Sequence, residues 1–366
     1  MAKPMYEGKL RYCLRCCMPE TQEGIQFDAR GICNGCNSSE EKMHIDWEVR
    51  EKALREKLEF YKEKYKDRAY DCLLPVSGGK DSFFQAYVLT RKYEMRPLAV
   101  TFSHNWFTEV GKRNLTRLLE TFAVDHIMFT PNRKLINRVA KRSIEVIGDS
   151  CWHCHAGVGA FVLQIAIKFG IPLICWGESL AEEGCRMSFF ESTKKDPFDA
   201  DYFVKISAKS RVDTFACGSV GKRELEMFRY PSTEEYHQAG VSGFHLGDYV
   251  FWDEERQVEF IKREFGWEED DIEGTYKKYK SVECVMPGLH DYTKFLKRGF
   301  GRATDHAARD VRAGLLTRDE AFELVNEHDS ERPKVLDYFL QQTGMSEEEL
   351  VEKVKALREG KAKDLP

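Results

Sequence analysis

The sequence predicts an α/β protein built on a doubly wound parallel sheet, with a cysteine-containing module before the sheet and helices after it. Residues 71–178 alternate short apolar runs with amphipathic segments of helical period. Two Cys-x-x-Cys pairs come before this stretch, and polar helical sequence follows it. We expect a zinc-ribbon-like module at 1–40, a linker helix at 41–68, the sheet domain at 69–180, a pocket-shaping insertion at 181–300 and a C-terminal helical region at 301–366.

The amino-acid composition of the chain argues for some kinds of binding partner and against others. The 366 residues carry 56 Lys and Arg against 61 Asp and Glu, a net charge of −5. This acidic balance argues against nucleic-acid binding through excess positive charge. The first residues contain no apolar signal segment, and no window of 18 apolar residues follows, so we expect a cytoplasmic protein without membrane contact. Twelve cysteines in a reducing compartment point to metal binding or catalysis.

Two cysteine pairs open the chain and predict a closed structural zinc site. Sixteen residues separate the pairs, whose members are Cys13, Cys16, Cys33 and Cys36. Cys17 is an additional thiol that could replace Cys16. The run 31–35, Gly-Ile-Cys-Asn-Gly, also has the spacing of a glutaminase nucleophile elbow. An elbow needs a buried strand before it, and residues 26–30 do not form an apolar run, so zinc is the preferred interpretation.

The linker and the first strand lead to a predicted anion-binding loop. Apolar residues recur at helical spacing among dense charges in 46–66, which indicates an exposed amphipathic helix. Residues 72–76 read as a buried strand, and a helix starts near 81. Between them, Ser77, Gly78, Gly79, Lys80, Asp81 and Ser82 combine free backbone N–H groups, a hydroxyl and a positive charge. The alternative is a glycine-rich turn without a ligand.

The remaining elements of the sheet domain follow in alternation. We expect strands at 97–102, 126–129 and 171–176, and helices near 109–122, 132–147 and 156–169. Ligands of such sheets bind beyond the carboxyl ends of the strands, where the strand order reverses. Those ends carry the loop 77–82, then Thr101 and Phe102, and then Gly177 and Glu178. Glu178 could bind magnesium or a substrate hydroxyl, or it could cap the next segment.

The run Cys151-Trp152-His153-Cys154-His155 leaves four interpretations open. Its form matches the attachment signature of haem c, but no export signal accompanies it. A thioredoxin-like redox pair would lack that fold's context. A second metal or an iron–sulfur cluster would need a third cysteine, with Cys217 and Cys284 as candidates. The fourth interpretation is a pair of thiols without metal.

A charged face is predicted near the C-terminal region. If residues 302–312 are helical, one side of the helix carries Arg302, Asp305, His306 and Arg309. This set suits a pocket for phosphate or carboxylate, and the alternative is an intramolecular salt-bridge cluster.

The loop Ser-Gly-Gly-Lys-Asp-Ser differs from the GxxxxGK[ST] loop of γ-phosphate-cleaving ATPases and resembles that of the ATP pyrophosphatase (PP-loop) superfamily, which is adenine nucleotide alpha hydrolase-like in fold. The resemblance implies cleavage of ATP between the α- and β-phosphates and transfer of AMP to a carbonyl oxygen. It implies ATP contacts from 77–82, Thr101, Phe102, Gly177 and Glu178, with Lys80 and Asp81 catalytic.

The combined motifs resemble one family within that superfamily. The N-terminal cysteine pairs, the loop, Leu-Gly-Asp-Tyr at 246–249, and His-Asp-Tyr followed by Lys-Arg-Gly-Phe-Gly-Arg-Ala-Thr-Asp-His within 290–306 are together similar to the N-acetyl sugar amidotransferases (WbpG/PseA-like). These act in bacterial surface-polysaccharide (O-antigen) and nonulosonic (pseudaminic) acid pathways. The resemblance implies conversion of an acetamido group on a sugar, often nucleotide-linked, to an acetamidino group. It implies ATP, Mg²⁺ and Zn²⁺ as cofactors, and sugar contacts from Asp248, Arg298, Arg302, Asp305, His306 and Arg309.

Ammonia for this reaction would come from a separate glutaminase subunit. A glutaminase with an N-terminal cysteine nucleophile would need it at position 2, which is Ala2. Two other classes stay open. One is a PP-loop tRNA-thiolating enzyme that uses Cys151, Cys154 and a third cysteine, and the other is a non-catalytic zinc-ribbon adaptor.

Overall fold

Five parallel strands form the central sheet of the computed structural model, which describes residues 2–182, 185–194 and 199–366. The strand order is β3-β2-β1-β4-β5. The bounds are Cys72–Pro75 for β1, Pro97–Phe102 for β2, His126–Phe129 for β3, Leu173–Trp176 for β4 and Ser242–His245 for β5. The order reverses between β1 and β4, as in doubly wound sheets, and the predicted fold class is confirmed.

The strands form because their apolar residues are buried on both faces of the sheet. Every residue of β2 is buried. On β1, Leu73 packs into one core, whereas Leu74 packs into the core on the opposite face. Leu73 lies opposite Leu98 of β2 and Ile174 of β4 in the parallel register. Continuous apolar runs of this kind are typical of parallel sheets covered by helices on both sides.

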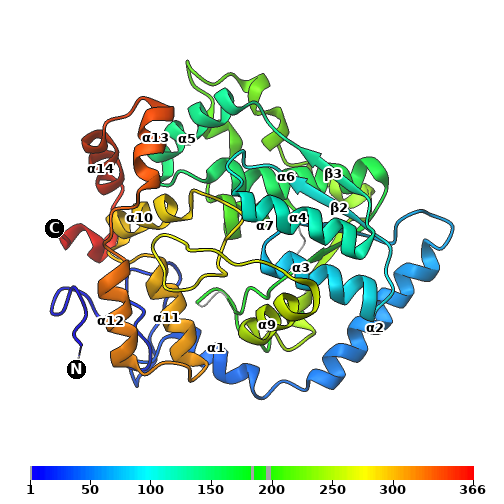
Figure 1. Cartoon of the computed structure of the whole chain (residues 1–366), viewed down its shortest axis with the longest axis horizontal. Helices are drawn as coiled ribbons and strands as arrows, with labels where there is room; N and C mark the ends of the chain where they lie inside the picture. The colour runs from blue at the N-terminus through cyan, green and yellow to red at the C-terminus, as the bar shows by residue number, and fades with distance from the viewer. Residues whose placement is uncertain (1, 183–184, 195–198) are drawn as a thin grey trace.

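Helices cover both faces (Figure 1). One core contains residues of α5, α6, α10, α13 and α14, and the other contains residues of α2, α3, α4 and α9. The bounds of the first group are Arg133–Ile147, Trp152–Phe169, Pro287–Arg298, Val335–Thr343 and Glu347–Ala356. Those of the second are Trp47–Lys64, Lys80–Tyr87, Glu109–Phe122 and Glu254–Phe265. Short helical segments α7 (Ala200–Phe203), η2 (Val204–Ala208), η3 (Val212–Phe215), η4 (Lys222–Phe228) and α8 (Thr233–Gln238) connect β4 to β5.

The strand β5 was not predicted from the sequence. It lies in the range 181–300 and pairs in parallel with β4, where Phe244 lies opposite Cys175. Only Phe244 of its four residues is buried, because β5 is the edge strand of the sheet. A four-residue strand with one buried side chain has too weak a pattern to recognise.

The cysteine module packs against the C-terminal helices α11 (Arg302–Arg312) and α12 (Arg318–His328). Its own helix, α1, spans Asn34–Lys42. The shared core joins the module's cysteines to Phe300, Ala307 and Phe322. Figure 1 shows the two ends of the chain on the same side of the molecule, beside these helices and the final turn η6 (Gly360–Asp364).

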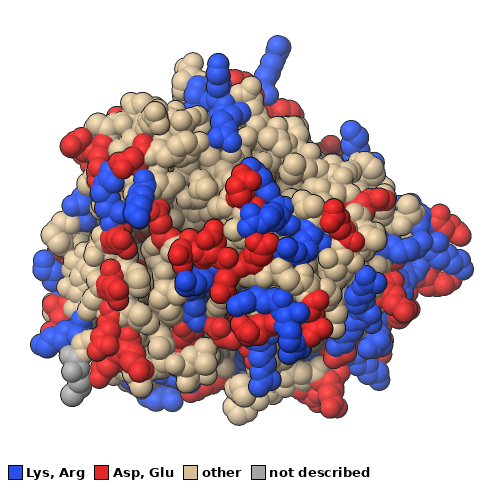
Figure 2. Space-filling model, viewed as in Figure 1, with Lys and Arg blue, Asp and Glu red and all other residues tan. Residues whose placement is uncertain are grey.

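Surface charge is mixed on the face seen in Figure 2, where Lys and Arg are interspersed with Asp and Glu. Within the described ranges, no single helix is long and apolar enough to cross a membrane. The pair α5 and α6 reaches the threshold only together, by length and composition, and is bent by 109° at its break.

Candidate functional site

The loop between β1 and α3 has the geometry of a phosphate-binding turn. Gly79 caps α3, so the first free N–H groups of the helix face the loop. The Ser82 hydroxyl donates to the Gly79 carbonyl at 3.0 Å, and the Gly79 N–H donates to the Ser77 hydroxyl at 3.2 Å. These side-chain bonds hold the loop in a fixed shape before any ligand arrives.

Gly78 makes the turn possible. Its φ of +86° lies in the left-handed region that favours glycine. A Cβ at this position would lie 2.7 Å from the Gly111 carbonyl oxygen of α4. The Gly78 carbonyl also accepts a hydrogen bond from the Trp267 indole at 3.0 Å, which ties the loop to the segment after α9.

Lys80 is buried at the start of α3, and its ammonium pairs with two carboxylates. The Lys80 Nζ lies 2.6 Å from Asp81 Oδ2 and 2.5 Å from Glu254 Oε1. Burial alone would lower the pKa of Lys80, but the carboxylates of Asp81 and Glu254 outweigh it and raise the pKa. Lys280 pairs with the same Glu254 carboxylate, and here burial wins and lowers the pKa of Lys280 to about 8.

Three carboxylates at this point could hold a divalent cation. Asp81, Glu178 and Glu254 each offer an oxygen, and these atoms lie within 4.8 Å of one another. Hard oxygen donors near a phosphate site are the ligands that Mg²⁺ prefers, so the donor set fits this ion. The carboxylates are now balanced by cations, and Arg309 Nη1 lies 3.5 Å from Glu178 Oε2.

A cavity of about 630 Å³ opens from the loop. Ten Lys and Arg residues and six Asp and Glu residues line it, so its walls are basic although the protein as a whole is acidic. Loop residues Ser77, Gly79, Lys80, Asp81 and Ser82 line one end. The predicted sugar-contact residues Arg298, Arg302, Asp305, His306 and Arg309 line it as well. The structure therefore brings the two predicted sites together.

Two arrangements were predicted for the charged face of α11, a pocket for an anion and an intramolecular ion-pair cluster, and the structure has features of both. Arg302 pairs with Asp291, and Asp305 pairs with Lys294, so an intramolecular ion-pair cluster exists. Burial would raise the pKa of Asp291, but Arg302 and Lys294 lower it to about 2. The same residues border the cavity, and the His306 ring bonds the Thr275 hydroxyl at 2.7 Å. The ion pairs thus hold the cations in place at the cavity wall.

A second cavity of about 510 Å³ lies beyond the ends of β1, β2 and β4. The predicted ATP-contact residues Thr101, Phe102, Gly177 and Glu178 line it. Ser77, Asp81, Ser82 and Glu178 border both cavities, so the two spaces meet at the loop. One cavity can hold the adenosine and the other a second substrate, with the phosphates between them.

Asp248 is the one predicted sugar-contact residue that is not among the lining residues of either large cavity. It lines a small cavity of about 30 Å³ with Ser192 and Tyr249. Burial is the main reason that the pKa of Asp248 rises to about 7. The backbone carbonyl of Asp248 accepts a hydrogen bond from Arg50 of α2 at 2.7 Å, so this residue connects the linker helix to the η5 turn (Leu246–Asp248).

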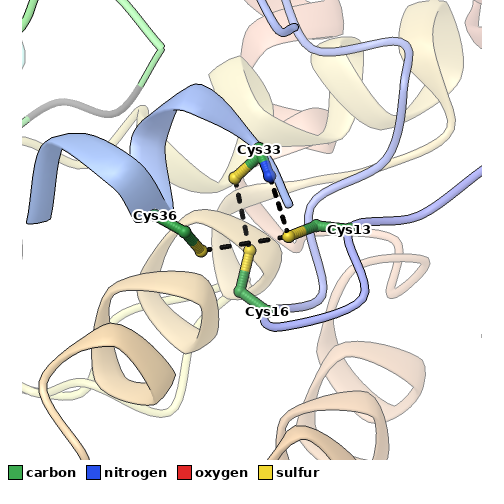
Figure 3. A group of neighbouring side chains, drawn as sticks. All are labelled: Cys13, Cys16, Cys33 and Cys36. Carbon is green, nitrogen blue, oxygen red and sulfur yellow. Dashed lines mark hydrogen bonds between the residues drawn. The ribbon is translucent and has the colours of Figure 1, made fainter. Parts of the chain in front are cut away.

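The four predicted zinc ligands converge on one point (Figure 3). Cys33 and Cys36 come from the start of α1, and Cys13 and Cys16 from the loop before it. Their sulfurs lie within 4.8 Å of one another, with Cys13 Sγ 3.9 Å from Cys36 Sγ and Cys16 Sγ 3.8 Å from Cys33 Sγ. All four side chains are buried, and the set fits a tetrahedral thiolate metal centre.

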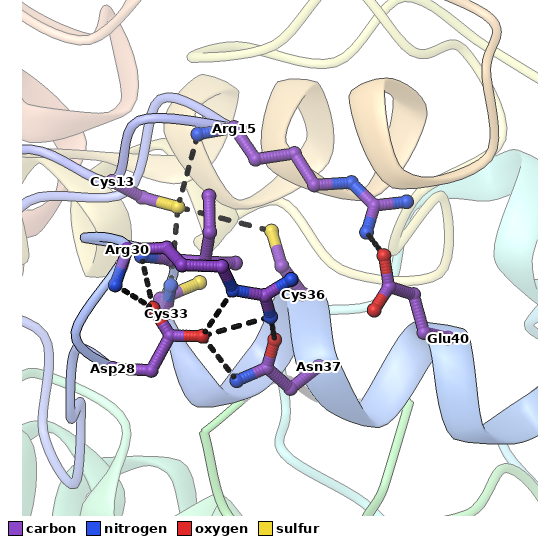
Figure 4. Close-up of polar contacts among 9 residues, drawn as sticks. Cys13, Arg15, Asp28, Arg30, Cys33, Cys36, Asn37 and Glu40 are labelled. Atoms are coloured by element: carbon purple, nitrogen blue, oxygen red, sulfur yellow. Dashed lines mark hydrogen bonds and ion pairs between the residues drawn. The ribbon is translucent and has the colours of Figure 1, made fainter.

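Neighbouring groups stabilise negative charge on these sulfurs. The backbone N–H groups of Arg15 and Cys33 donate to Cys13 Sγ at 3.4 and 3.3 Å. Figure 4 shows the surrounding polar contacts, in which Asp28 binds Arg30 and Arg15 binds Glu40. Cys17 points away and donates to the Thr304 carbonyl of α11 at 3.6 Å, so the structure selects Cys16 for the cluster.

Cys151 and Cys154 lie half-buried at the start of α6 and line the second cavity. Cys284 lines the same cavity, whereas Cys217 is exposed in a turn with Val220. Of the two candidates for a third cysteine, only Cys284 is therefore near the pair. Cys151 also lies within 4.8 Å of donor atoms on Asp149 and His290.

Three site residues were not found from the sequence. Lys280 and Glu254 complete the ion pairs around Lys80, and Glu283 accepts a hydrogen bond from the Ser77 hydroxyl at 3.3 Å. None of these residues belongs to a recognisable motif. The only signal was the helix start at Asp253, which caps α9 and places Glu254 in its first turn.

Comparisons with a family model, with a relative and with a solved structure show what this chain is similar to. The sequence model of the family described as "LPS biosynthesis protein WbpG-like, C-terminal domain" matches residues 273–363. An uncharacterized protein from Methanocaldococcus jannaschii is 22% identical over 318 residues, 86% of this chain and 91% of the relative. Among solved structures, the U34-tRNA thiolase NcsA from Methanococcus maripaludis, solved with its 4Fe–4S cluster, is similar over 89% of this chain and 90% of its own, with 12% identity and a TM-score of 0.35. The segment from the approach to α10 through η6 is thus similar to the C-terminal domain of WbpG-like proteins.

Proposed function

We propose that this protein is an ATP-dependent amidotransferase that converts the acetamido group of a sugar into an acetamidino group. One observation carries the proposal. The adenylylating type of loop at 77–82 and the cationic face at 302–309 border one cavity, and that face lies in the segment matched by the WbpG-like family model.

The chemistry explains why both sites are needed. An amide carbon is a poor electrophile because its oxygen is a poor leaving group. In the first step the amide oxygen attacks the α-phosphorus of ATP, and the bond from that phosphorus to the bridging oxygen of pyrophosphate breaks. In the second step ammonia attacks the imidate carbon, the C–O bond breaks, and AMP leaves with the oxygen. The nitrogen gives up a proton to leave the amidine.

The chain's residues supply positioning and charge. The N–H groups at the start of α3 and the Lys80 ammonium bind the departing pyrophosphate. Asp81, Glu178 and Glu254 would hold Mg²⁺, which would further neutralise the phosphates. Arg302 and Arg309 bind anionic groups of the sugar and orient its amide toward the α-phosphate.

We also assign Zn²⁺ to Cys13, Cys16, Cys33 and Cys36, in a mainly structural role. Four buried thiols with N–H···S bonds are typical of closed zinc sites. A glutaminase partner supplies ammonia, because the elbow-like Cys33 belongs to this thiol cluster.

Product mass tests the proposed reaction. The purified chain is incubated with ATP, Mg²⁺, ammonium and a panel of UDP-linked acetamido sugars. Replacement of O by NH lowers the sugar mass by about one dalton and adds a basic group. We expect one member of the panel to show this change with release of AMP and pyrophosphate. An unchanged panel together with thiolation of tRNA would contradict the proposal.

Thiolation is the second candidate, and the position of Cys284 beside Cys151 and Cys154 favours it. If these cysteines bind an iron–sulfur cluster, anaerobically purified protein is brown and Cys154→Ala loses the colour. Cys217→Ala is the matched control, because Cys217 is exposed outside the cavity. Colourless, fully active wild-type protein would exclude a catalytic cluster.

A further inference from the structure

Three side chains with different donor atoms converge beside the second cavity, outside the loop 77–82 and the four-cysteine cluster. They are Asp149, Cys151 and His290, whose donor atoms all lie within 4.8 Å of one another. Cys151 and His290 line the second cavity. We propose that these three residues form a second metal site, for a borderline divalent ion such as Zn²⁺, with a coordination position open to that cavity. The inference is independent of the proposed amidotransferase reaction.

The turn between α5 and α6 supplies two of the donors. Gly148 ends α5 with a φ of +65°, and Cys151 directly precedes the first residue of α6. The Asp149 Oδ1 atom accepts a hydrogen bond from the Cys151 backbone N–H at 2.8 Å. The Asp149 carbonyl accepts another from the Ser143 hydroxyl of α5, which anchors the turn. The spacing Asp-x-Cys in this anchored turn therefore brings an oxygen donor close to a sulfur donor.

His290 brings the third donor from near the start of α10, in a distant part of the chain. Its Nδ1 atom lies 2.8 Å from Asp149 Oδ1. Ligands about 2.0–2.2 Å from one tetrahedral zinc ion lie roughly 3.3–3.6 Å apart, so the two atoms would need to separate by less than about 1 Å. Metal binding would release to solvent the proton between these two atoms and the proton of the Cys151 thiol.

The charge of the three residues suits a divalent ion. Burial would raise the pKa of Asp149, but His290 outweighs it and holds this pKa below its usual range. The charges of His155 and Lys209 act in the same direction. With the Cys151 thiolate, the ionised Asp149 presents two negative charges, which one divalent ion balances. Since His155 and Lys209 oppose a further positive charge, we expect weaker metal binding than at the four-cysteine cluster.

The donor set narrows the choice of ion and predicts an open position. Sulfur, nitrogen and oxygen donors together favour borderline transition-metal ions over Mg²⁺ and Ca²⁺, which take oxygen ligands. Within residues 2–182, 185–194 and 199–366, this group of donors has three members. Zinc sites with three protein ligands leave the fourth position to water or a substrate atom. Because Cys151 and His290 line the second cavity, an oxygen or nitrogen atom of a molecule in that cavity is the expected fourth ligand.

The proposed site and an iron–sulfur cluster would compete for Cys151. A cluster would need Cys154 and Cys284, and neither belongs to the group of donors within 4.8 Å. The proposed site needs Asp149 and His290 instead. The two assignments therefore predict opposite effects of substitution at these positions.

Cobalt binding tests the site in the full-length chain with its four-cysteine cluster already loaded with zinc. Co²⁺ added anaerobically should bind as one further ion per chain and give thiolate-to-cobalt charge-transfer absorption. Cys151→Ser should abolish this absorption, and Asp149→Asn and His290→Gln should each weaken Co²⁺ binding at least about tenfold. Thermal unfolding before cobalt is added identifies the variants that fold, and any one of the three is sufficient for the comparison.

Cys154→Ser and Cys284→Ser are the matched controls, and both should bind Co²⁺ as the wild type does. Exchange of cobalt into the four-cysteine cluster would give absorption that persists in Cys151→Ser, and this result would overturn the assignment. A wild-type chain that binds no further ion, or a loss of Co²⁺ binding in Cys154→Ser, would also overturn it. Azide should shift the cobalt absorption, and an unshifted spectrum would show that the fourth position is closed.

The outcomes separate this inference from the proposed reaction. If the further ion binds through Asp149, Cys151 and His290 but no acetamido sugar in the panel loses one dalton, the reaction is wrong and the metal site stands. If a sugar is converted by a chain that binds no further ion, the metal site is wrong and the reaction stands.

Discussion

At the scale of single residues, Lys80 links the loop 77–82 to the carboxylates that surround it. Its ammonium lies between Asp81 and Glu254, at the place where a divalent cation would bind these oxygens. If ATP and magnesium bind here as proposed, Lys80 would exchange these carboxylates for phosphate oxygens. The ion pairs with Asp81 and Glu254 hold this positive charge beside the loop in the absence of a ligand.

Lys80→Ala should reduce ATP turnover by about 10²–10³-fold, because it removes a preorganised charge at the leaving pyrophosphate. The products of the residual reaction should still be AMP and pyrophosphate, which are separated by ion-exchange chromatography. Lys353→Ala is the charge-matched control. Release of ADP and phosphate by the wild type would mean that the loop cleaves the other bond.

Gly78→Ala should lower the free energy of unfolding by more than about 1–2 kcal/mol, the cost of a left-handed alanine alone. The added Cβ would also lie 2.7 Å from the Gly111 oxygen. Gly177→Ala is the control, since its Cβ would meet no atom closer than 3.5 Å. Urea denaturation of both variants without ligand measures the difference, and equal stability would contradict the strain at Gly78.

At the scale of elements, the cysteine module, α11 and α12 form one packing unit. The cysteines share a core with Ala307 of α11 and Phe322 of α12, although about 300 residues separate them along the chain. Arg312 of α11 donates to Cys16 Sγ and Cys33 Sγ at 3.9 and 3.8 Å. Metal binding by the module should therefore stabilise the C-terminal helices as well.

Cys33→Ser should lower the zinc content by about one ion per chain and lower the melting temperature, because metal binding supplies folding energy. Cys17→Ser is the matched control, since the Cys17 sulfur bonds a backbone carbonyl and stays outside the cluster. Atomic absorption and thermal unfolding measure the two effects. Full zinc occupancy in Cys33→Ser would overturn the assignment.

Asp329, directly after α12, should make the stability of this unit depend on pH. It accepts hydrogen bonds from the Thr304 backbone and hydroxyl, but burial dominates and raises the pKa of Asp329 to about 6. The folded chain therefore holds this proton more tightly than the unfolded chain, in which the pKa is about 4. The resulting stabilisation is fully present below about pH 4 and is lost as the pH rises through 6.

The size of this effect is at most about 3 kcal/mol, for a pKa difference of about two pH units. Denaturant unfolding of wild type and Asp329→Asn between pH 4 and 7 measures it. The difference in unfolding free energy between the two proteins should shift in favour of the variant across this window. A constant difference would show that Asp329 keeps an ordinary pKa.

At the scale of the whole molecule, the candidate site is assembled where distant parts of the chain meet. The loop follows the first strand of the sheet, residues of the cysteine module line part of the cavity, and α10 and α11 provide five of its ten Lys and Arg residues. The described residues that form these walls do not include an independent nucleophile elbow. For the proposed reaction, free ammonium should therefore support product formation by this chain alone, whereas glutamine should work only with an added glutaminase.

Parallel assays with ammonium and with glutamine, each followed by product mass, check this dependence. Boiled partner extract serves as the control for contaminating ammonia. Equal rates with glutamine and ammonium in the purified chain would mean that it carries its own glutaminase activity.

Local sequence determined the strands β1 to β4, the phosphate loop and the four-cysteine cluster, because each depends on residues close together or on a repeated spacing. The structure alone decided which distant segments meet. Packing brought Glu254, Lys280 and Glu283 to the loop, placed Cys284 rather than Cys217 at the cavity of Cys151 and Cys154, and placed Asp248 away from the large cavities. The edge strand β5 likewise depends on the hydrogen bonds that β4 offers it. These outcomes depend on long-range burial and pairing, which leave no periodic pattern in the chain.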